Sequence, residues 1–334
     1  MSKRILAVLF LLLLIVGTVF VLSSSQFYKT EGHIFGTSYH VEYSSKHNLD
    51  REILAELQRV DSALSMFKEQ STLSRFNNNL PYAPNEMFDE TMKMALHISK
   101  ETEGAFDITV APLVNAWGFG FKNRDDVTQT MVDSLLQFVG YQKLQLVGKQ
   151  YRKDDSRLSV DMGAIAKGYG VDRVARLLAA KGCKNYIVEV GGEVVARGLN
   201  AKGEKWTLGI NQPIEDSTQT QQSLQAIVRL TDCGVATSGN YRNFYYKGGR
   251  KYAHTIHPHT GYPVEHSLLS ATVIAPTCAQ ADAYATSFMV MGLDKAKQFV
   301  QKHPKIDAYL IYADDKGQLQ TWTSKRMKHY LENQ

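Results

Sequence analysis

Apolar residues recur at every third or fourth position in several stretches of the chain. In the stretch 50–67, Ile53, Leu57, Val60 and Leu64 follow this spacing, and charged residues occupy many of the positions between them. Because this spacing places apolar side chains on one face of a helix, it predicts an amphipathic helix packed against a core. Similar patterns predict helices over 85–102, 128–138, 162–181, 278–291 and 294–303.

Other stretches alternate apolar and polar residues, as half-buried β-strands do. The stretch 36–43 is one of them, and 245–253 predicts a hairpin about its Gly-Gly pair. Further strands are expected over 143–147, 157–160, 186–190, 206–210, 225–230, 268–274, 306–312 and 318–323, with the first two and the last two paired as hairpins. Helices and strands do not alternate as βαβ units, so the pattern favours an α+β fold with antiparallel sheets over a doubly wound sheet.

The N-terminus has its own pattern. Lys3 and Arg4 precede an uninterrupted run of low polarity over 5–22, and small polar residues follow it. This order is typical of an export signal, and the run is close to the ~20 residues that span a bilayer. We expect residues 1–25 to be a cleaved signal peptide or a retained membrane anchor, and residues 26–334 to form a single domain. The basic flank predicts that this domain is exported, to the periplasmic face of the inner membrane in a Gram-negative bacterium.

Composition narrows the function classes. The net charge of +5 comes from Lys and Arg residues scattered along the chain, which is not the pattern of a nucleic-acid-binding surface. Cys183, Cys233 and Cys278 form no C-x-x-C pair, and they are expected to be small buried apolar residues. No glycine-rich phosphate loop of a common type is present.

The stretch 158–172 combines a short apolar run, an acidic residue and a helix start. Asp161 precedes Gly163 and Ala164, and Lys167 follows one turn later. One interpretation is a core helix with Asp161 as its N-cap. The other is a phosphate site, because small residues leave the helix start accessible and Lys167 adds positive charge beside the helix N-terminus.

Two other segments carry candidate chemistry. In 104–114, Phe106 and Asp107 are expected in a loop that lines a pocket, where they bind a ring, or else Asp107 caps its own buried backbone. Asp282 and Thr286 are four residues apart on a predicted helix, so their oxygens share one face and suit Mg²⁺. The alternative is that Thr286 bonds back to its own helix and that Asp282 is only a charge in the first turn of the helix.

Three histidines lie close together at 254–259, followed by Gly261. They lack the spacing of a helical zinc site and have no partnering cysteine, and Pro258 marks a turn. One histidine with a catalytic or positioning role is the favoured interpretation.

Eight short segments in register resemble the ApbE family of FAD:protein FMN transferases, over about residues 32–325. They are Gly36-Thr37, Ser71-x-x-Ser74-x-Phe76-Asn77, Gly104-Ala105-Phe106-Asp107-x-Thr109, Asp161-x-Gly163-Ala164-Ile165-Ala166-Lys167-Gly168-Tyr169, Glu189-x-Gly191-Gly192, Ala236-x-Ser238-Gly239, His254-x-x-x-Pro258-x-Thr260-Gly261 and Asp282-Ala283-x-Ala285-Thr286. Two positions depart from the family pattern: Phe35 stands where the family usually has Met, and His257 where it usually has Asp.

The resemblance implies an α+β, T-fold-like domain that uses Mg²⁺ and FAD. Such an enzyme attaches FMN through a phosphoester to a Thr or Ser hydroxyl of a target protein and releases AMP. Family targets include subunits of the sodium-translocating NADH:quinone reductase and related electron-transport complexes. Two other functions remain open from the sequence: an Mg²⁺-dependent FAD pyrophosphatase that gives FMN and AMP, and a non-catalytic exported flavin-binding protein.

The resemblance also implies the site residues. FAD would be bound by the following residues, with Ile256 acting through its backbone: Phe35, Phe67, Ala105, Phe106, Asp107, Asp161, Lys167 and Ile256. The metal would be held by the Ala164 carbonyl, Asp282, the Ala285 carbonyl and Thr286. His254 and Asp282 are the candidates for proton transfer from the target hydroxyl.

Overall fold

The computed structural model describes residues 25–120, 127–148, 150–213, 223–241, 244–247 and 250–332. The expected signal or anchor over 1–25 falls outside these ranges except for Ser25, and so does the turn at 248–249. Within the described ranges, no helix combines the length and the apolar character needed to cross a bilayer.

A sheet of eight strands forms the centre of the described chain, and all of its neighbouring strands are antiparallel. The strand order is β1-β2-β5-β6-β9-β12-β13-β14. The bounds are β1 (Gln26–Ile34), β2 (Thr37–Ser45), β5 (Tyr186–Val190), β6 (Glu193–Arg197), β9 (Cys233–Gly239), β12 (Leu268–Ala275), β13 (Asp307–Ala313) and β14 (Leu319–Thr323). The predicted α+β class with antiparallel pairing is confirmed, and five of the predicted strands lie in this one sheet: 36–43, 186–190, 268–274, 306–312 and 318–323.

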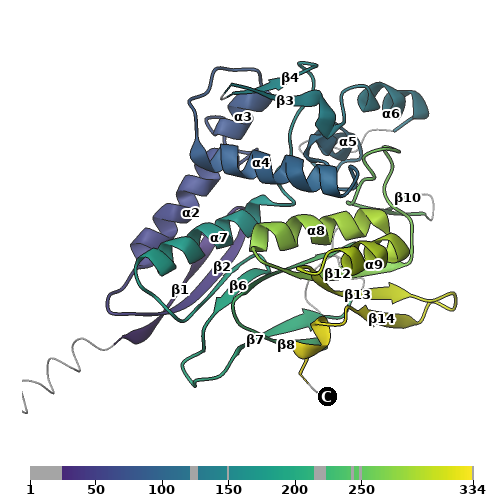
Figure 1. The fold of residues 1–334 in the computed structure, drawn as a ribbon. Helices are drawn as coiled ribbons and strands as arrows, with labels where there is room; N and C mark the ends of the chain where they lie inside the picture. The colour runs from purple at the N-terminus through teal and green to yellow at the C-terminus, as the bar shows by residue number, and fades with distance from the viewer. Residues whose placement is uncertain are drawn as a thin grey trace, which may run out of the picture.

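Alternation along the strands places a core on each face of the sheet. In β13, Ala308 and Leu310 pack in the core under the helices, whereas Tyr309 and Ile311 pack in a second core on the opposite face. Helices α2 (Asp50–Leu64), α7 (Ala166–Ala180), α8 (Cys278–Met291) and α9 (Leu293–Lys302) cover the first face, and the hairpin of β7 (Trp206–Asn211) and β8 (Leu224–Leu230) covers the second (Figure 1).

Contacts between α7 and α8 fix the central part of the helical layer. The buried Asp172 carboxylate of α7 accepts hydrogen bonds from the backbone N–H groups of Cys278 and Ala279, at 2.8 and 2.9 Å. Gly168 lies so close to α8 that a Cβ atom there would be 2.5 Å from the Cys278 carbonyl oxygen. These two contacts bring the first turn of α7 against the first turns of α8, where the candidate site residues lie.

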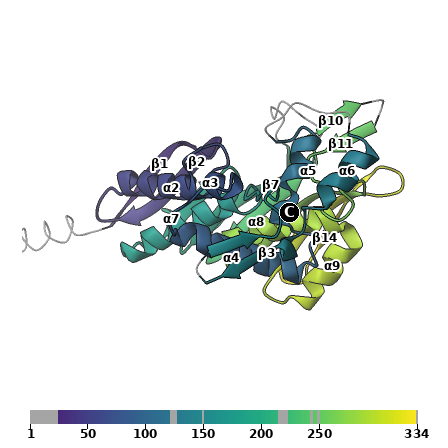
Figure 2. The same ribbon diagram turned by 90° about the horizontal axis from the view of Figure 1, so that it is seen from above.

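Smaller elements surround one end of the helical layer. They are α3 (Thr72–Asn77), α4 (Glu86–Glu101), the 3₁₀ turn η1 (Ile108–Val110), α5 (Ala111–Ala116), α6 (Gln129–Leu136), η2 (Tyr141–Lys143), β3 (Leu144–Val147), β4 (Gln150–Lys153), β10 (Phe244–Lys247) and β11 (Arg250–Ala253). The 3₁₀ turn η3 (Met327–His329) lies on the other face of the sheet, where Met327 packs in the second core. Helices α5 and α6 lie beside the β10–β11 hairpin (Figure 2), and Leu113, Trp117 and Ile256 share a small core there.

Three sequence predictions need correction. The stretch 104–114 is regular over η1 and α5, since Pro112 fits the first turn of a helix. The strand paired with β3 is β4, not 157–160. Leu158 and Val160 are buried as the alternation suggested, but the Asn77 side chain bonds both the N–H and the carbonyl of Val160 in place of a neighbouring strand.

The third correction concerns the start of α7. The helix begins at Ala166, not at Met162, and Asp161 is not its N-cap. Asp161 Oδ1 accepts from Gly163 N at 2.6 Å, which folds 161–163 into a separate turn ahead of the helix. Gly163 and Ala164 therefore belong to a turn rather than to the helix.

Candidate active site

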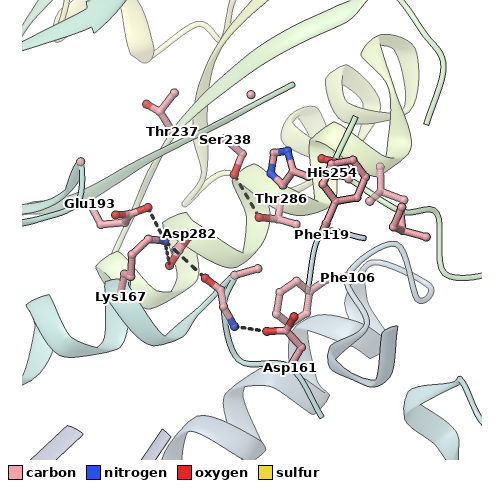
Figure 3. A pocket seen from close by; sticks show the side chains of 18 of the residues that line it. Phe106, Phe119, Asp161, Lys167, Glu193, Thr237, Ser238, His254, Asp282 and Thr286 are labelled. Carbon is pink, nitrogen blue, oxygen red and sulfur yellow. Dashed lines mark hydrogen bonds and ion pairs between the residues drawn. The ribbon is translucent and has the colours of Figure 1, made fainter. Parts of the chain in front are cut away.

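A cavity of about 630 Å³ lies where the first turns of α7 and α8 meet the ends of β6 and β9 (Figure 3). Ten of the predicted site residues line it. They are Ala105, Phe106, Asp107, Asp161, Ala164, Lys167, His254, Ile256, Asp282 and Thr286. Volumes of this order are typical of small-molecule sites. The fold thus gathers residues from four distant segments around one cavity.

Lys167 lies at the charged end of the cavity. Its Nζ is 2.9 Å from Glu193 Oε1 and 3.9 Å from Asp282 Oδ2, and it also contacts the Gly163 carbonyl at 3.5 Å. Burial disfavours the charged form, but the carboxylates of Asp282 and Glu193 outweigh it and raise the pKa of Lys167 above its ordinary value. The ammonium therefore stays charged and supplies positive potential beside the turn at 161–163.

The Asp282 carboxylate is 3% exposed and accepts a long hydrogen bond, 3.2 Å, from Gly168 N. Burial raises its pKa, although Lys167 opposes this shift. One turn later, Thr286 Oγ1 is 3.1 Å from Ser238 Oγ of β9, so the hydroxyl pairs across to the sheet. The Asp282 carboxylate and the Thr286 hydroxyl are hard oxygen ligands, and Lys167 only partly offsets the cost of burying the carboxylate charge. Such a cluster of oxygens fits a small divalent cation such as Mg²⁺.

Aromatic residues form the other end of the cavity. Phe106 is buried, and the ring of Phe119 lies edge-on to His254 with centroids 6.4 Å apart. Asp107 has a structural role: Oδ1 accepts from the N–H and hydroxyl of Thr109, and Oδ2 accepts from Tyr141 N. Its pKa is raised by burial despite these bonds. These contacts agree with one of the two interpretations of Asp107, in which its carboxylate caps the buried backbone of its own loop.

Three predicted site residues are not part of the cavity lining. Phe67 is 78% exposed and is not part of the cavity lining. Phe35 and Gly36 form the two-residue turn between β1 and β2, both with positive φ, and the Phe35 ring lies against Gly170 of α7, outside the lining. Ala285 is buried on α8 beside Thr286. Roles for these residues at the ligand stay predictions.

His257, which departs from the family pattern, acts in the turn after β11. Its Nδ1 accepts a hydrogen bond from His259 N at 3.2 Å, a contact that an Asp carboxylate at this position would also make. Burial and the neighbouring His259 lower the pKa of His257, which favours the neutral ring that this bond requires. His257 and His259 line a separate cavity, whereas His254 lines the main one.

Some residues of the cavity were not predicted. Glu193 and Ser238 contact Lys167 and Thr286 directly, and Glu189 and Thr237 also line the cavity. The sequence offered some signals, since Glu189 and Ser238 stand in two of the eight family segments and Glu193 follows the Gly191-Gly192 pair. Pairing with Lys167 depends on the order of strands in the sheet, which no local pattern reports.

Burial raises the pKa of Glu193 to about 8, with Lys167 opposing and Asp282 reinforcing the shift. The folded state therefore holds this proton more tightly than the unfolded chain, so the free energy of unfolding should fall as pH rises from about 4.5 to about 8. We expect the melting temperature of Glu193→Gln to decline less than that of the parent over this range. Parallel melting curves of the two proteins against pH would contradict this.

Comparison with known proteins identifies the family to which this chain belongs. The family model described as "ApbE family" matches residues 35–310, which is most of the chain. The chain belongs to the ApbE family. All of the residues that line the cavity lie within the span of the ApbE match.

Two curated relatives named FAD:protein FMN transferase support the ApbE assignment. The one from Salmonella typhimurium is 37% identical over 316 residues, covering 90% of this chain and 88% of that protein. The one from Haemophilus influenzae is 37% identical over 306 residues, covering 86% of each.

Solved structures agree with the ApbE fold. The flavin transferase ApbE from Vibrio cholerae has a TM-score of 0.81 and 34% identity, and covers 92% of this chain and 100% of that one. The flavinyl transferase ApbE of Pseudomonas stutzeri, in an apo form, also has a TM-score of 0.81, with 31% identity over 92% of this chain and 97% of that one.

Proposed function

We propose that this chain binds FAD in the cavity and, with Mg²⁺, transfers FMN to a Thr or Ser hydroxyl of a target protein. The hydroxyl oxygen attacks the flavin-side phosphorus, the pyrophosphate P–O bond breaks, and AMP leaves with the bridging oxygen. The transfer of FMN from FAD to a protein is the activity for which the curated relatives are named. The chain is therefore a transferase whose substrate is FAD.

The observation that carries the proposal is the meeting of Lys167, Asp282 and Thr286 on one wall of the cavity. Phosphoryl transfer depends mainly on positioning and on neutralising negative charge. Lys167 provides a fixed positive charge, and Asp282 and Thr286 provide oxygens for Mg²⁺, together with the carbonyls of Ala164 and Ala285. When bound, the cation would neutralise charge on the pyrophosphate.

The remaining predicted residues divide between the two ends of the cavity. Phe106, with Ala105 and Ile256, forms the apolar part, which suits the flavin ring. Asp161 holds the turn whose Gly163 and Ala164 face the pyrophosphate end. His254 lies on the aromatic side and is the proposed acceptor of the hydroxyl proton, with Asp282 as the other candidate.

Lys167→Met is expected to weaken FAD binding by about tenfold to a hundredfold, because it removes a charge-assisted contact to phosphate. Most of the fold should survive, since the carboxylates of Glu193 and Asp282 then protonate more readily. Calorimetric titration with FAD measures the affinity, and circular dichroism checks the fold. An affinity equal to that of the parent would reject the role of Lys167.

A pyrophosphatase is the second candidate, because water entering the same cavity would give FMN and AMP. A non-catalytic flavin-binding protein is the third, but it would not need the oxygen cluster of Asp282 and Thr286. An acceptor assay separates the three. Residues 26–334 would be mixed with FAD, Mg²⁺ and a candidate subunit with an accessible Thr.

Flavin fluorescence on the denatured acceptor, lost when its Thr is changed to Ala, is the expected result. AMP release that needs Mg²⁺, without labelling of the acceptor, would favour the pyrophosphatase. Binding of FAD without AMP release and without labelling of the acceptor would favour the non-catalytic flavin-binding protein.

The proposed setting is the periplasmic face of the bacterial inner membrane, reached through the N-terminal signal or anchor. It rests on Lys3, Arg4 and the apolar run over 5–22. The proposed targets are subunits of the sodium-translocating NADH:quinone reductase or related complexes. Fractionation of cells that express the full chain tests the location, and recovery in the cytoplasm would refute it.

A further inference from the structure

Glu193 is a buried carboxylate at the charged end of the cavity, and the function proposed above gives it no role. It is the first residue of β6, and its side chain is 6% exposed. Its Oε1 is 2.9 Å from Lys167 Nζ, the shortest contact that the structure gives for this ammonium (Figure 3). Its other oxygen, Oε2, is buried and has no hydrogen-bond partner among the described residues.

The turn that precedes Glu193 in the chain lies alongside the Lys167 side chain. Gly191 and Gly192 both have positive φ, at 61° and 97°, which allows the chain to reverse between β5 and β6. A Cβ atom on Gly191 would lie 3.4 Å from Lys167 Cδ and 2.8 Å from Thr37 Cγ2. The turn therefore lies along the aliphatic part of Lys167, and Glu193 contacts its charged end.

The other polar contacts of Lys167 are weaker. Asp282 Oδ2 is 3.9 Å away and the Gly163 carbonyl is 3.5 Å away. Under the proposed function, Asp282 also binds a divalent cation, which would reduce its attraction for the ammonium. Glu193 is then the contact that keeps Lys167 in place.

A purely structural explanation fits Glu193 less well. A carboxylate kept to satisfy nearby backbone groups would use both of its oxygens, whereas Oε2 is unsatisfied within the described residues. Burying a carboxyl group that has one unpaired oxygen is costly. A role in the cavity, where Oε1 contacts the Lys167 ammonium, accounts for that cost better than a purely structural role does.

We propose that Glu193 is a positioning residue that holds the Lys167 ammonium at the phosphate-binding end of the cavity through a hydrogen bond to Oε1. This inference rests on the proposed function, because it assumes that Lys167 binds the pyrophosphate of FAD. Lysine has a flexible four-carbon side chain, so ordering it before the ligand arrives lowers the entropy that binding must overcome. Glu193 acts through Lys167 and does not itself contact the ligand.

A double-mutant cycle tests the proposal, with FAD affinity measured by titration in the absence of an acceptor protein. Glu193→Leu removes the hydrogen-bond acceptor at similar volume, and we expect it to weaken FAD binding by about tenfold in the parent. In the Lys167→Met background, the same change should have an effect below about twofold. Glu193→Gln keeps an amide oxygen and should stay within about threefold of the parent. Glu204→Leu, at an exposed carboxylate, is the matched control.

The outcomes separate this inference from the proposed function. If Lys167→Met alone leaves FAD affinity unchanged, the proposed function fails. If Lys167→Met weakens binding and Glu193→Leu costs the same factor in both backgrounds, Glu193 does not act through Lys167 and the inference is overturned. The inference is also overturned if the FAD affinity of Glu193→Leu falls only in proportion to a fall in its melting temperature. Should Glu193→Leu fail to fold, Glu193→Asp replaces it, because the shorter side chain draws the carboxylate away from Lys167.

Discussion

Replacing Asp282 with Asn should lower the rate of FMN transfer by about 10³-fold or more while the protein remains folded. The Asn side chain keeps the size of Asp and an oxygen that accepts from Gly168 N. It loses the charge that, with Thr286, would hold Mg²⁺, and electrostatic stabilisation of this kind supplies a large share of the rate of phosphoryl transfer. Burial disfavours the charged carboxylate, so the melting temperature should stay near that of the parent.

The measurement is labelling of an acceptor protein with flavin over a range of Mg²⁺ concentrations. Asp294→Asn, an exposed carboxylate in the first turn of α9, is the matched control and should retain parental activity. Full activity of Asp282→Asn at low Mg²⁺ would eliminate the cation-binding role. An equal loss in Asp294→Asn would show that the assay responds to general charge and not to the site.

The features that the sequence predicted best are those set by local spacing. Helix α8 has the predicted bounds, 278–291, so Asp282 and Thr286 share a face as their spacing of four residues requires. The Tyr245–Ala253 hairpin and the 186–190 strand were also found where alternation indicated. In such segments, burial of one face and local propensity favour the same structure.

The features that sequence could not supply depend on contacts between distant segments. No local pattern indicated that the Thr286 hydroxyl lies beside Ser238, which is 48 positions earlier in the chain, whereas its predicted role as a cation ligand stays a prediction. One of the two interpretations of Asp161 was a helix N-cap, because acidic residues are favoured at that position, whereas Asp161 holds a separate turn. Glu193 was missed because strand order alone brings it to Lys167.

Gly168→Ala should destabilise the protein and impair the site together. The new Cβ atom would lie 2.5 Å from the Cys278 carbonyl oxygen and 2.8 Å from Ala279 Cα. These are backbone atoms of α8, so relief requires the two helices to separate. Overpacking of this kind costs about 1–3 kcal/mol, and the better helix propensity of Ala offsets about 1 kcal/mol of that. Because the clashing atoms are backbone, we expect the upper end of this range, a net loss of about 2 kcal/mol, seen as a fall in melting temperature of about 3 °C for a domain of this size.

The effect on activity should be larger than the loss of stability suggests. Gly168 N donates to Asp282, and Lys167 is its neighbour, so separating α7 from α8 moves the ammonium away from the carboxylate. A displacement near 1 Å is enough to reduce catalysis by about 10²-fold. Gly170→Ala is the matched control on the same helix: its Cβ would lie 2.6 Å from the Phe35 ring, which is a side chain and not the backbone of α8, so α7 and α8 need not separate. Transfer assays under conditions where all variants are folded should rank parent, Gly170→Ala and Gly168→Ala in descending order. If Gly168→Ala transfers FMN as fast as Gly170→Ala, close contact of the two helices is not what aligns Lys167 with Asp282.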